Sequence, residues 1–255
     1  MKQLKAVIFD VDGTLAETER DGHRIAFNRA FADAGLDWHW DEQLYGKLLS
    51  ITGGKERLQY YLENFHLQCG FAGDYRDMIA KLHADKNWHY VALLESQAIQ
   101  LRTGVKRLIE ELRAAGVRLA ISTTSTPENV TGLIKATLGE AALNWFDCIA
   151  AGDIVPAKKP APDIYLYCLQ QLQLEASECL AIEDSNNGLQ AACAADISTL
   201  VTLNDYTEEE DFNQAVCVVD QLGEPESPSK VIAGSPINTS YITAQTIQDL
   251  HAKAN

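Results

Sequence analysis

The sequence lacks the cysteine patterns of metal sites and of disulfide frameworks. No two of its six cysteines have C-x-x-C spacing, and no short group of cysteines and histidines has the spacing of a zinc site. The cysteines are Cys69, Cys148, Cys168, Cys179, Cys193 and Cys217. Scattered thiols of this kind are typical of buried side chains, so we expect free thiols in a reducing compartment.

Long apolar runs and an excess of positive charge are also missing. No uninterrupted apolar run approaches the ~18 residues that a membrane span requires. Residues 1–6 lead directly into a predicted strand, which leaves no room for a secretory signal. Acidic residues outnumber basic ones by 36 to 21, and the net charge of −15 repels phosphate backbones. We therefore expect no nucleic-acid or membrane partner and a cytoplasmic protein, or a plastid stromal one if a transit peptide was removed.

Short apolar runs alternate with helical patterns along most of the 255 residues. The runs, rich in β-branched residues, lie at 6–9, 117–121, 148–151, 179–182 and 199–203. Helical patterns lie at 105–115, 128–138, 163–172 and 187–195. This alternation predicts an α/β fold with a doubly wound parallel sheet, a Rossmann-like core.

One stretch breaks the alternation. Residues 17–95 contain amphipathic helical patterns and no convincing strand, which predicts a small all-helical domain inserted into a core formed by residues 1–16 and 96–255. Trp38 and Trp40 are expected in the apolar core of this insertion. Near the C-terminus, residues 223–236 have a loop-like composition, and residues 243–254 are expected to form a short helix.

Polar residues follow each of the first four predicted strands. They are Asp10 and Asp12; Thr123, Thr124 and Ser125; Lys159; and Glu183, Asp184 and Ser185. Each group alone has an ordinary structural explanation, such as a turn, a helix cap or a surface lysine. Ligands bind at the carboxyl edge of a parallel sheet, however, and four successive strand ends would bring all of these groups to that edge. Together they predict an active site.

The predicted cluster favours phosphoryl transfer. Neighbouring carboxylates repel one another unless a divalent cation lies among them, and Mg²⁺ prefers oxygen ligands. A carboxylate could then attack phosphorus, while a hydroxyl and a lysine hold the phosphoryl oxygens. A second aspartate two residues further along could protonate the leaving group and later activate water. This chemistry predicts a covalent aspartyl-phosphate.

These motifs resemble the haloacid dehalogenase-like superfamily of phosphotransferases. Its signatures occur in order as Asp10-Val11-Asp12-Gly13-Thr14, Ala120-Ile121-Ser122-Thr123, Lys159-Pro160 and Ile182-Glu183-Asp184-Ser185. The resemblance implies that Asp10 is the nucleophile, Asp12 the general acid/base, Lys159 the family's lysine and Thr123 the hydroxyl of the second motif, with Ser122 as an alternative one residue earlier. It also implies that Mg²⁺ is bound by Asp10, the backbone carbonyl of Asp12 and Asp184, with Glu183 close by.

The helical insertion resembles the small cap domain of the subgroup that contains β-phosphoglucomutase and phosphoglycolate phosphatase. Its motifs, among them Leu15-Ala16-Glu17-Thr18-Glu19 and Thr52-Gly53-Gly54-Lys55-Glu56-Arg57, look like those of CbbY-type proteins. This resemblance implies a monomeric Mg²⁺-dependent phosphatase of a small sugar phosphate, with xylulose 1,5-bisphosphate of the Calvin cycle as the leading substrate. Thr14 favours hydrolysis, since β-phosphoglucomutases often have an apolar residue there. The alternatives are a sugar phosphate mutase and a catalytically idle metal-binding scaffold.

The cap is expected to determine which substrate is bound. Gly53, Gly54 and Lys55 form a candidate anion site for a second phosphate, because glycines let backbone N–H groups approach an anion. The other candidate substrate contacts are Arg57, Glu17, His23, Tyr45, Thr124 and Ser125; an interhelical turn and packing are the structural alternatives for the cap positions. Asn186 departs from relatives that carry a basic residue there, so substrate choice could differ.

Overall fold

The computed structural model describes residues 2–65 and 75–254, so the predicted free thiol Cys69 lies outside the described residues. The chain divides into two compact units: residues 1–17 with 100–255, and residues 18–99. Within the described ranges, no helix combines the length and the apolar character needed to cross a membrane.

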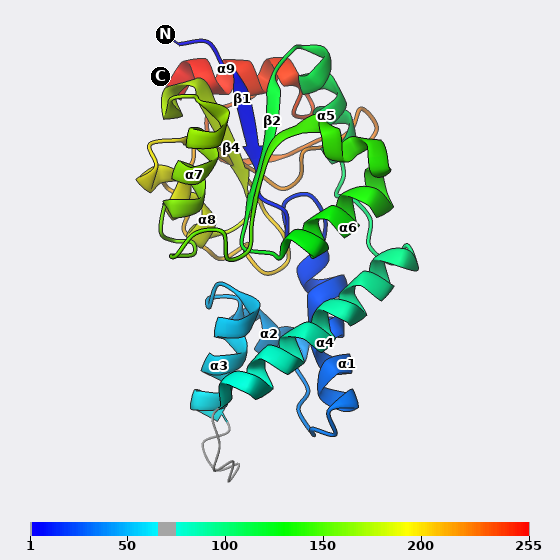
Figure 1. Ribbon diagram of the computed structural model, residues 1–255. Coiled ribbons are helices and arrows are strands. Elements are labelled where there is room, and N and C mark those ends of the chain that lie inside the picture. The colour runs from blue at the N-terminus through cyan, green and yellow to red at the C-terminus, as the bar shows by residue number, and fades with distance from the viewer. Residues whose placement is uncertain (1, 66–74, 255) are drawn as a thin grey trace. The chain divides into compact units, whose positions relative to one another are not determined.

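The first unit is built on a seven-stranded sheet with the strand order β3-β2-β1-β4-β5-β6-β7. Figure 1 shows β1 between β2 and β4. The strands are β1 (Ala6–Phe9), β2 (Arg118–Thr123), β3 (Phe146–Ala151), β4 (Cys179–Glu183), β5 (Ser198–Thr202), β6 (Cys217–Val219) and β7 (Val231–Gly234). All neighbouring pairs are parallel except β6 and β7. The predicted doubly wound α/β fold is confirmed.

Strands β6 and β7 were not expected, and the prediction of an entirely loop-like segment at 223–236 is wrong. The residues of β7 pair antiparallel with β6, and β7 forms the last strand at that edge of the sheet. The proline- and glycine-rich flanks conceal this four-residue strand, which has a mostly exposed pattern and therefore no hydrophobic alternation to reveal it.

The helices of this unit lie on both faces of the sheet. They are α5 (Val105–Ala114), α6 (Pro127–Leu138), α7 (Asp163–Leu172), α8 (Asn186–Ala194) and α9 (Ala244–Ala254), with 3₁₀ turns at Glu140–Trp145 and Ala176–Glu178. The connections through α5 and α6 run from β1 towards β3, whereas those through α7 and α8 run from β3 towards β5. Because such crossovers are right-handed, the two pairs cover opposite faces.

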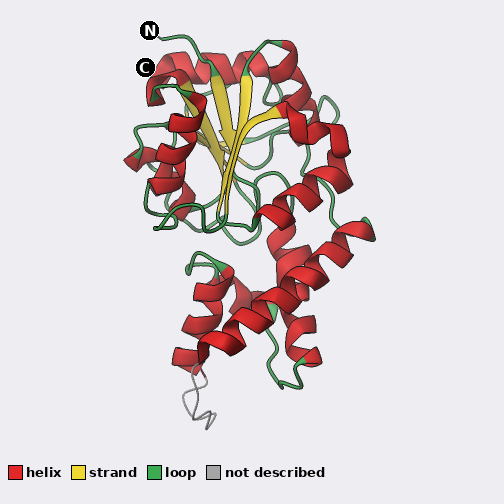
Figure 2. Ribbon diagram, viewed as in Figure 1, coloured by secondary structure: helices red, strands yellow, loops and turns green. Residues whose placement is uncertain are grey.

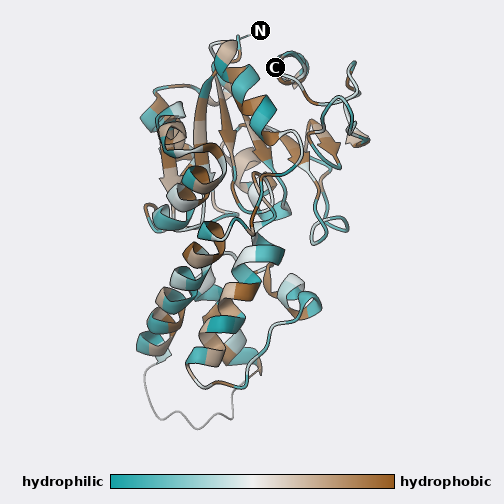
Figure 3. Ribbon diagram, turned by 90° about the vertical axis from the view of Figure 1, so that its right-hand side faces the viewer, coloured by the Kyte–Doolittle hydropathy of each residue, from teal (hydrophilic) through white to brown (hydrophobic). Residues whose placement is uncertain are grey.

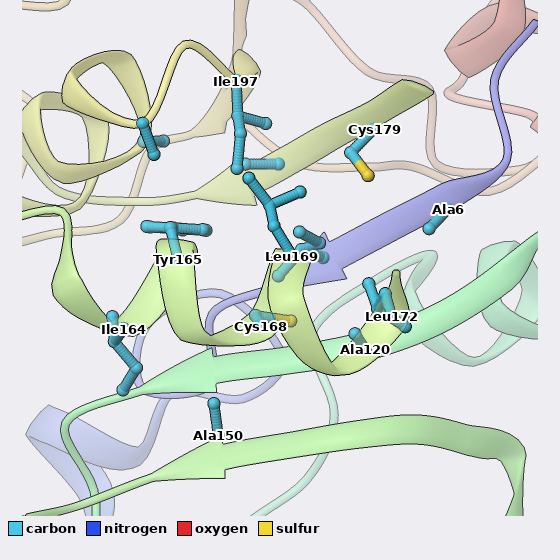
Figure 4. Packing of buried hydrophobic residues seen from close by; sticks show 14 of the residues in the cluster. Ala6, Ala120, Ala150, Ile164, Tyr165, Cys168, Leu169, Leu172, Cys179 and Ile197 are labelled. Atoms are coloured by element: carbon cyan, nitrogen blue, oxygen red, sulfur yellow. The ribbon is translucent and has the colours of Figure 1, made fainter. Parts of the chain in front are cut away.

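Helix α7 packs directly on the central strands. Tyr165, Cys168 and Leu169 face a layer of small strand residues that includes Ala6 and Ala120 (Figure 4). These small side chains allow the helix to lie close to the sheet, and the strands are correspondingly hydrophobic in Figure 3. The close approach brings Tyr165, at the start of α7, beside the carboxyl ends of the strands.

The strand register determines which residues meet at the carboxyl edge. Phe9, the last residue of β1, pairs with Ile121 of β2 and with Ile182 of β4. The next residues on the three strands are Asp10, Ser122 and Glu183, so the register brings them to the same level. The sheet thereby assembles a site from segments more than a hundred residues apart in the sequence.

Within its described residues, the second unit contains helices and loops but no strand (Figure 2). It comprises a π-helical turn (Glu19–His23), α1 (Arg24–Asp33), α2 (Glu42–Leu48), α3 (Gly54–Phe65) and α4 (Tyr75–Glu95). Trp38 and Trp40 lie in an aromatic core with Phe31 and Tyr61, as predicted. Helix α2, which was not predicted, is capped by Asp41, whose side chain accepts a hydrogen bond from Leu44 N at 2.7 Å.

Candidate active site

Lys159 is the central cation at the carboxyl edge of the sheet. Its Nζ donates hydrogen bonds to Asp10 Oδ1 at 2.6 Å, to Glu183 Oε1 at 2.6 Å and to the Ser122 carbonyl oxygen at 2.9 Å. Lys159 is buried, as are both carboxylates. Its neighbour Lys158 instead pairs with Asp153 at 3.0 Å. The lysine that the sequence favoured therefore lies among the predicted acidic residues.

Asp184 lies in the same cluster and is held from two sides. Thr14 Oγ1 donates to its Oδ1 at 3.2 Å, and Asn204 Nδ2 donates to its Oδ2 at 2.7 Å. Asp10, Glu183 and Asp184 each offer an oxygen within 4.8 Å of the others, and all three are buried. Asp12 is half-buried and follows Asp10 by two residues.

The cluster contains three buried carboxylates and one buried lysine, so its negative charge exceeds its positive charge. Burial, together with the charges of Glu183 and Asp12, raises the pKa of Asp10 to about 8 although Lys159 lowers it. Burial and the charges of Asp10 and Glu183 raise the pKa of Asp184 well above its ordinary value, although Arg102 lowers it. Burial alone would lower the pKa of Lys159, but Asp10 and Glu183 raise it. The cluster therefore favours an additional cation.

Two glycines make room for the carboxylates. A Cβ at Gly13, whose φ is +82°, would lie 2.2 Å from Asp184 Oδ2. A Cβ at Gly188 would lie 1.9 Å from Glu183 Oε2. Any larger residue at either position would displace a carboxylate, so both glycines are required by the site rather than only by their turn or helix.

The hydroxyls of the second motif lie at the end of β2. Ser122 and Thr123 are buried, whereas Thr124 and Ser125 are half-buried in the loop that follows. Ser122 contributes its carbonyl oxygen to Lys159, and Thr123 Oγ1 accepts a hydrogen bond from Ser125 N at 3.2 Å. All four residues follow or end the strand adjacent to β1, as the predicted arrangement requires.

Within the second unit, Tyr45 and Arg57 form a buried cluster with Glu19. Arg57 Nη1 donates to Tyr45 Oη at 2.8 Å and lies 3.6 Å from Glu19 Oε2, and Tyr45 Oη donates to Glu19 Oε2. Arg57 Nε also donates to the Leu48 carbonyl at 3.2 Å. The structure thus brings two of the predicted substrate contacts together with each other.

The remaining predicted contacts lie in separate places. Glu17 pairs with Arg102 Nε at 2.7 Å in the first unit. His23 is buried in the second unit and stacks on Tyr90 with ring centroids 4.2 Å apart. Gly53, with φ of +98°, precedes α3, which begins at Gly54, and Lys55 is exposed on that helix.

A model of the haloacid dehalogenase-like hydrolase family matches residues 4–196. The chain belongs to this family. The matched region contains Asp10, Lys159 and Asp184, so the family match includes the residues of the acidic cluster. The resemblance stated from the motifs is confirmed, and so is the predicted enzyme class, a phosphatase.

This hydrolase is similar to proteins named CbbY. It is 46% identical over 225 residues to the plasmid CbbY of Cupriavidus necator, covering 88% of each chain. It is 49% identical over 213 residues to CbbY of Rhodobacter capsulatus, covering 84% of this chain and 91% of that protein. A crystal structure of an aspartate-to-asparagine variant of Rhodobacter sphaeroides CbbY with xylulose 1,5-bisphosphate matches with a TM-score of 0.80 and 44% identity, covering 86% of this chain and 94% of the other.

Three residues of this hydrolase contact the cluster or its loops and were not predicted. Tyr165 Oη donates to Glu183 Oε1, Asn204 donates to Asp184, and Arg102 reaches the carbonyl of Gly13. Asn204 could have been found, because it comes shortly after the fifth predicted strand and lies at the same sheet edge as the other four groups. Neither Tyr165 nor Arg102 has such a signal, since each reaches the site from outside the motifs.

Proposed function

We propose that this enzyme is a Mg²⁺-dependent phosphatase that hydrolyses a small sugar bisphosphate, with xylulose 1,5-bisphosphate as the preferred substrate, through an aspartyl-phosphate on Asp10. The observation that carries the proposal is the contact of Lys159 Nζ with both Asp10 and Glu183 beside Asp184. The CbbY relative bound to xylulose 1,5-bisphosphate supports the choice of substrate. We also propose that residues 17–95 act as the cap domain of this enzyme.

The residues present fit a Mg²⁺ ion. Buried carboxylates are the ligands that Mg²⁺ prefers, and Glu183 Oε2 is a buried oxygen with no hydrogen-bond partner among the described residues. Asp10, Asp184 and the carbonyl of Asp12 would hold the ion, with Glu183 close to it. When bound, Mg²⁺ supplies the positive charge that keeps the carboxylates ionised and neutralises an incoming phosphate.

In the first half of the reaction, a carboxylate oxygen of Asp10 attacks the phosphorus atom. The bond between phosphorus and the sugar oxygen breaks as the new bond to Asp10 forms. Asp12 donates its proton to the leaving oxygen, which departs as the sugar alcohol. Lys159 and Thr123 stabilise the phosphoryl oxygens, on which negative charge is spread in the transition state.

In the second half, water attacks the aspartyl-phosphate. Asp12, now ionised, accepts a proton from the water as the oxygen binds phosphorus. The bond between phosphorus and Asp10 breaks, which regenerates the carboxylate and releases inorganic phosphate. We propose that the hydroxyls of Thr124 and Ser125, in the loop after β2, are further phosphate contacts.

The proposal is tested by phosphate release with Mg²⁺ from a panel of substrates. The panel contains xylulose and ribulose 1,5-bisphosphates, fructose 1,6-bisphosphate, phosphoglycolate and β-glucose 1-phosphate, with Asp10→Asn as the blank. We expect kcat/KM for xylulose 1,5-bisphosphate to exceed the others at least ~10²-fold, or ~2.7 kcal/mol. A flat profile would contradict this specificity, and reversible conversion of glucose 1-phosphate would favour a mutase instead. Unchanged cellular function of the Asp10→Asn variant would favour the catalytically idle metal-binding scaffold.

A second phosphate is proposed to bind beside Gly53, Gly54 and Lys55 in the cap. The positive φ of Gly53 and the exposed ammonium of Lys55 support an anion site there. We predict that Lys55→Ala raises KM about tenfold for a bisphosphate and less than about twofold for a monophosphate, since one charged contact is worth ~1.5 kcal/mol. Steady-state kinetics with a bisphosphate and with a monophosphate measure the two changes in KM, and equal changes would contradict the assignment of the second phosphate to this site.

We also propose that Glu17 and His23 contact the sugar.

We further propose that the enzyme works in a reducing compartment. Five cysteines in the described part of the chain are free thiols, and most of them are buried. Thiols in this state are typical of such compartments.

We also propose that the enzyme is a monomer. Gel filtration with light scattering would measure its oligomeric state.

A further inference from the structure

We propose that Arg102 is a positioning residue for the general acid/base Asp12; the inference rests on the proposed phosphatase function. Its guanidinium reaches the loop that carries Asp12 and the ends of two strands of the sheet. Nε pairs with Glu17, Nη1 donates to the carbonyls of Gly13 and Thr202, and Nη2 donates to those of Leu203 and Asp220.

These contacts use the full hydrogen-bonding capacity of an arginine. A guanidinium has five N–H donors in a fixed planar fork, and the five acceptors listed above take one each. The side chain is 9% exposed, so almost all of this network is shielded from water. A lysine has three donors on a flexible stem and no fork, and therefore cannot hold the same set of carbonyls together.

The loop that Arg102 holds is a closed turn around Asp12. Gly13 N donates to the Ala16 carbonyl at 2.9 Å, and Leu15 N donates to the Val11 carbonyl at 2.8 Å. Arg102 N also donates to the Leu15 carbonyl at 2.9 Å. The turn is thus rigid within itself, and Arg102 joins it to the sheet through both its backbone and its side chain.

The strand ends on the other side of Arg102 lead directly to the acidic cluster. Thr202 is the last residue of β5, Leu203 follows it, and Asn204 then donates to Asp184 at 2.7 Å. Arg102 therefore fixes the turn that contains Asp12 against the segment that orients Asp184. Losing this connection would allow Asp12 to move relative to the phosphoryl group on Asp10.

Asp12 matters most when the leaving group needs a proton. An alkoxide or a phenoxide is a poor leaving group, whereas 4-nitrophenolate departs readily without protonation. General acid catalysis typically contributes 10²–10⁴-fold. A misplaced Asp12 should therefore slow phosphoryl transfer from phenyl phosphate much more than from 4-nitrophenyl phosphate, while a general loss of folded enzyme would slow both equally.

The test compares Arg102→Lys with Arg107→Lys. Arg107 also makes several contacts, to Glu224, Glu111 and the Gly223 carbonyl, but in the described part of the chain none of these groups is a hydrogen-bond partner of Asp10, Glu183 or Asp184. We expect Arg102→Lys to lower kcat/KM for phenyl phosphate at least about tenfold more than for 4-nitrophenyl phosphate, because kcat/KM reports the first phosphoryl transfer. Arg107→Lys should change both less than about twofold. Asp12→Ala, which removes the proton donor, should show the same selective loss as Arg102→Lys.

Equal losses on the two aryl phosphates in a folded Arg102→Lys enzyme would overturn the inference. If that variant does not fold, Glu17→Gln removes only the ion pair and should shift the ratio in the same direction; an unchanged ratio would overturn the inference as well. Neither probe contains a sugar, so a contact between Glu17 and a sugar cannot produce the shift. A wild-type enzyme that releases phosphate from neither probe nor from the sugar phosphates would reject the proposed function itself.

Discussion

The two units each contain a buried cation that bonds to a carboxylate, with a tyrosine hydroxyl donating to the same carboxylate. In the first unit, Lys159 and Tyr165 both donate to Glu183. In the second unit, Arg57 lies 3.6 Å from Glu19, to which Tyr45 also donates. The chemical groups are the same, but their surroundings differ in charge.

The difference lies in the number of additional carboxylates. Asp10 and Asp184 lie with Glu183 beside one lysine, whereas the described ion pair of the second cluster joins one arginine to one glutamate. Because these two charges offset each other, we propose a structural role for the second cluster as the alternative to the substrate contacts predicted for Tyr45 and Arg57. The first has excess negative charge, which favours binding of Mg²⁺ and phosphate. Charge balance, more than residue type, distinguishes a site that can bind from one that only stabilises.

The largest effect is expected from Lys159→Met. This change removes the cation between Asp10 and Glu183 and a contact for the phosphoryl oxygens, so we predict that kcat falls about 10³-fold, or ~4 kcal/mol. Steady-state phosphate release measures the loss. The matched control is Lys158→Met, which removes the pair with Asp153 and should retain kcat within about threefold. A kcat for Lys159→Met within tenfold of wild type would remove the distinction between the two clusters.

A smaller effect, on stability, is expected from Arg57→Met. The change leaves Glu19 and Tyr45 without their cation, and we predict that the free energy of unfolding falls by about 3 kcal/mol, as for other broken buried ion pairs. Urea unfolding monitored by circular dichroism measures it. An unchanged midpoint together with a raised KM for bisphosphate would show instead that Arg57 binds substrate, and the two clusters would then share a role.

The smallest effect concerns pH in the absence of metal. Burial raises the pKa of Asp10 from 3.8 to about 8 in the folded protein. The contribution of Asp10 to the free energy of unfolding is therefore most favourable below about pH 4, where this carboxyl is protonated in both states, and it is lost as the pH rises towards 8. We predict that, in EDTA, wild type loses on the order of 2 kcal/mol more stability than Asp10→Asn between pH 5 and 8. Added Mg²⁺ should reduce the difference. Parallel pH profiles of the two proteins in EDTA would contradict the charge imbalance.

Much of the acidic cluster was predictable because parallel strands impose a simple rule. Residues after successive strands meet at one edge, so Asp10, Lys159 and Asp184 could be assigned to one site from their order alone. The helical character of residues 17–65 and 75–95 followed equally from the missing strand patterns. The motifs then added the family, which the match over residues 4–196 confirms.

The contacts that arise from tertiary packing could not be predicted in this way. Tyr165 reaches Glu183 only because α7 lies close to a layer of alanines, and Arg102 meets its carbonyls only when β5 and β6 are in place. Nor does the sequence reveal that Tyr45 and Arg57 bond to each other, since they lie twelve positions apart on two different helices. Sequence order predicts which strand ends meet, but not which side chains join them.

The central claim is that Asp10 carries the phosphoryl group during turnover. Wild type and Asp10→Asn would be mixed with Mg²⁺ and xylulose 1,5-bisphosphate, quenched in acid within milliseconds and digested for mass spectrometry. We predict one added phosphoryl group on the peptide that contains Asp10 in wild type, and none in Asp10→Asn, which should also release no phosphate. A phosphoryl group on another residue, or undiminished phosphate release by Asp10→Asn, would contradict the account.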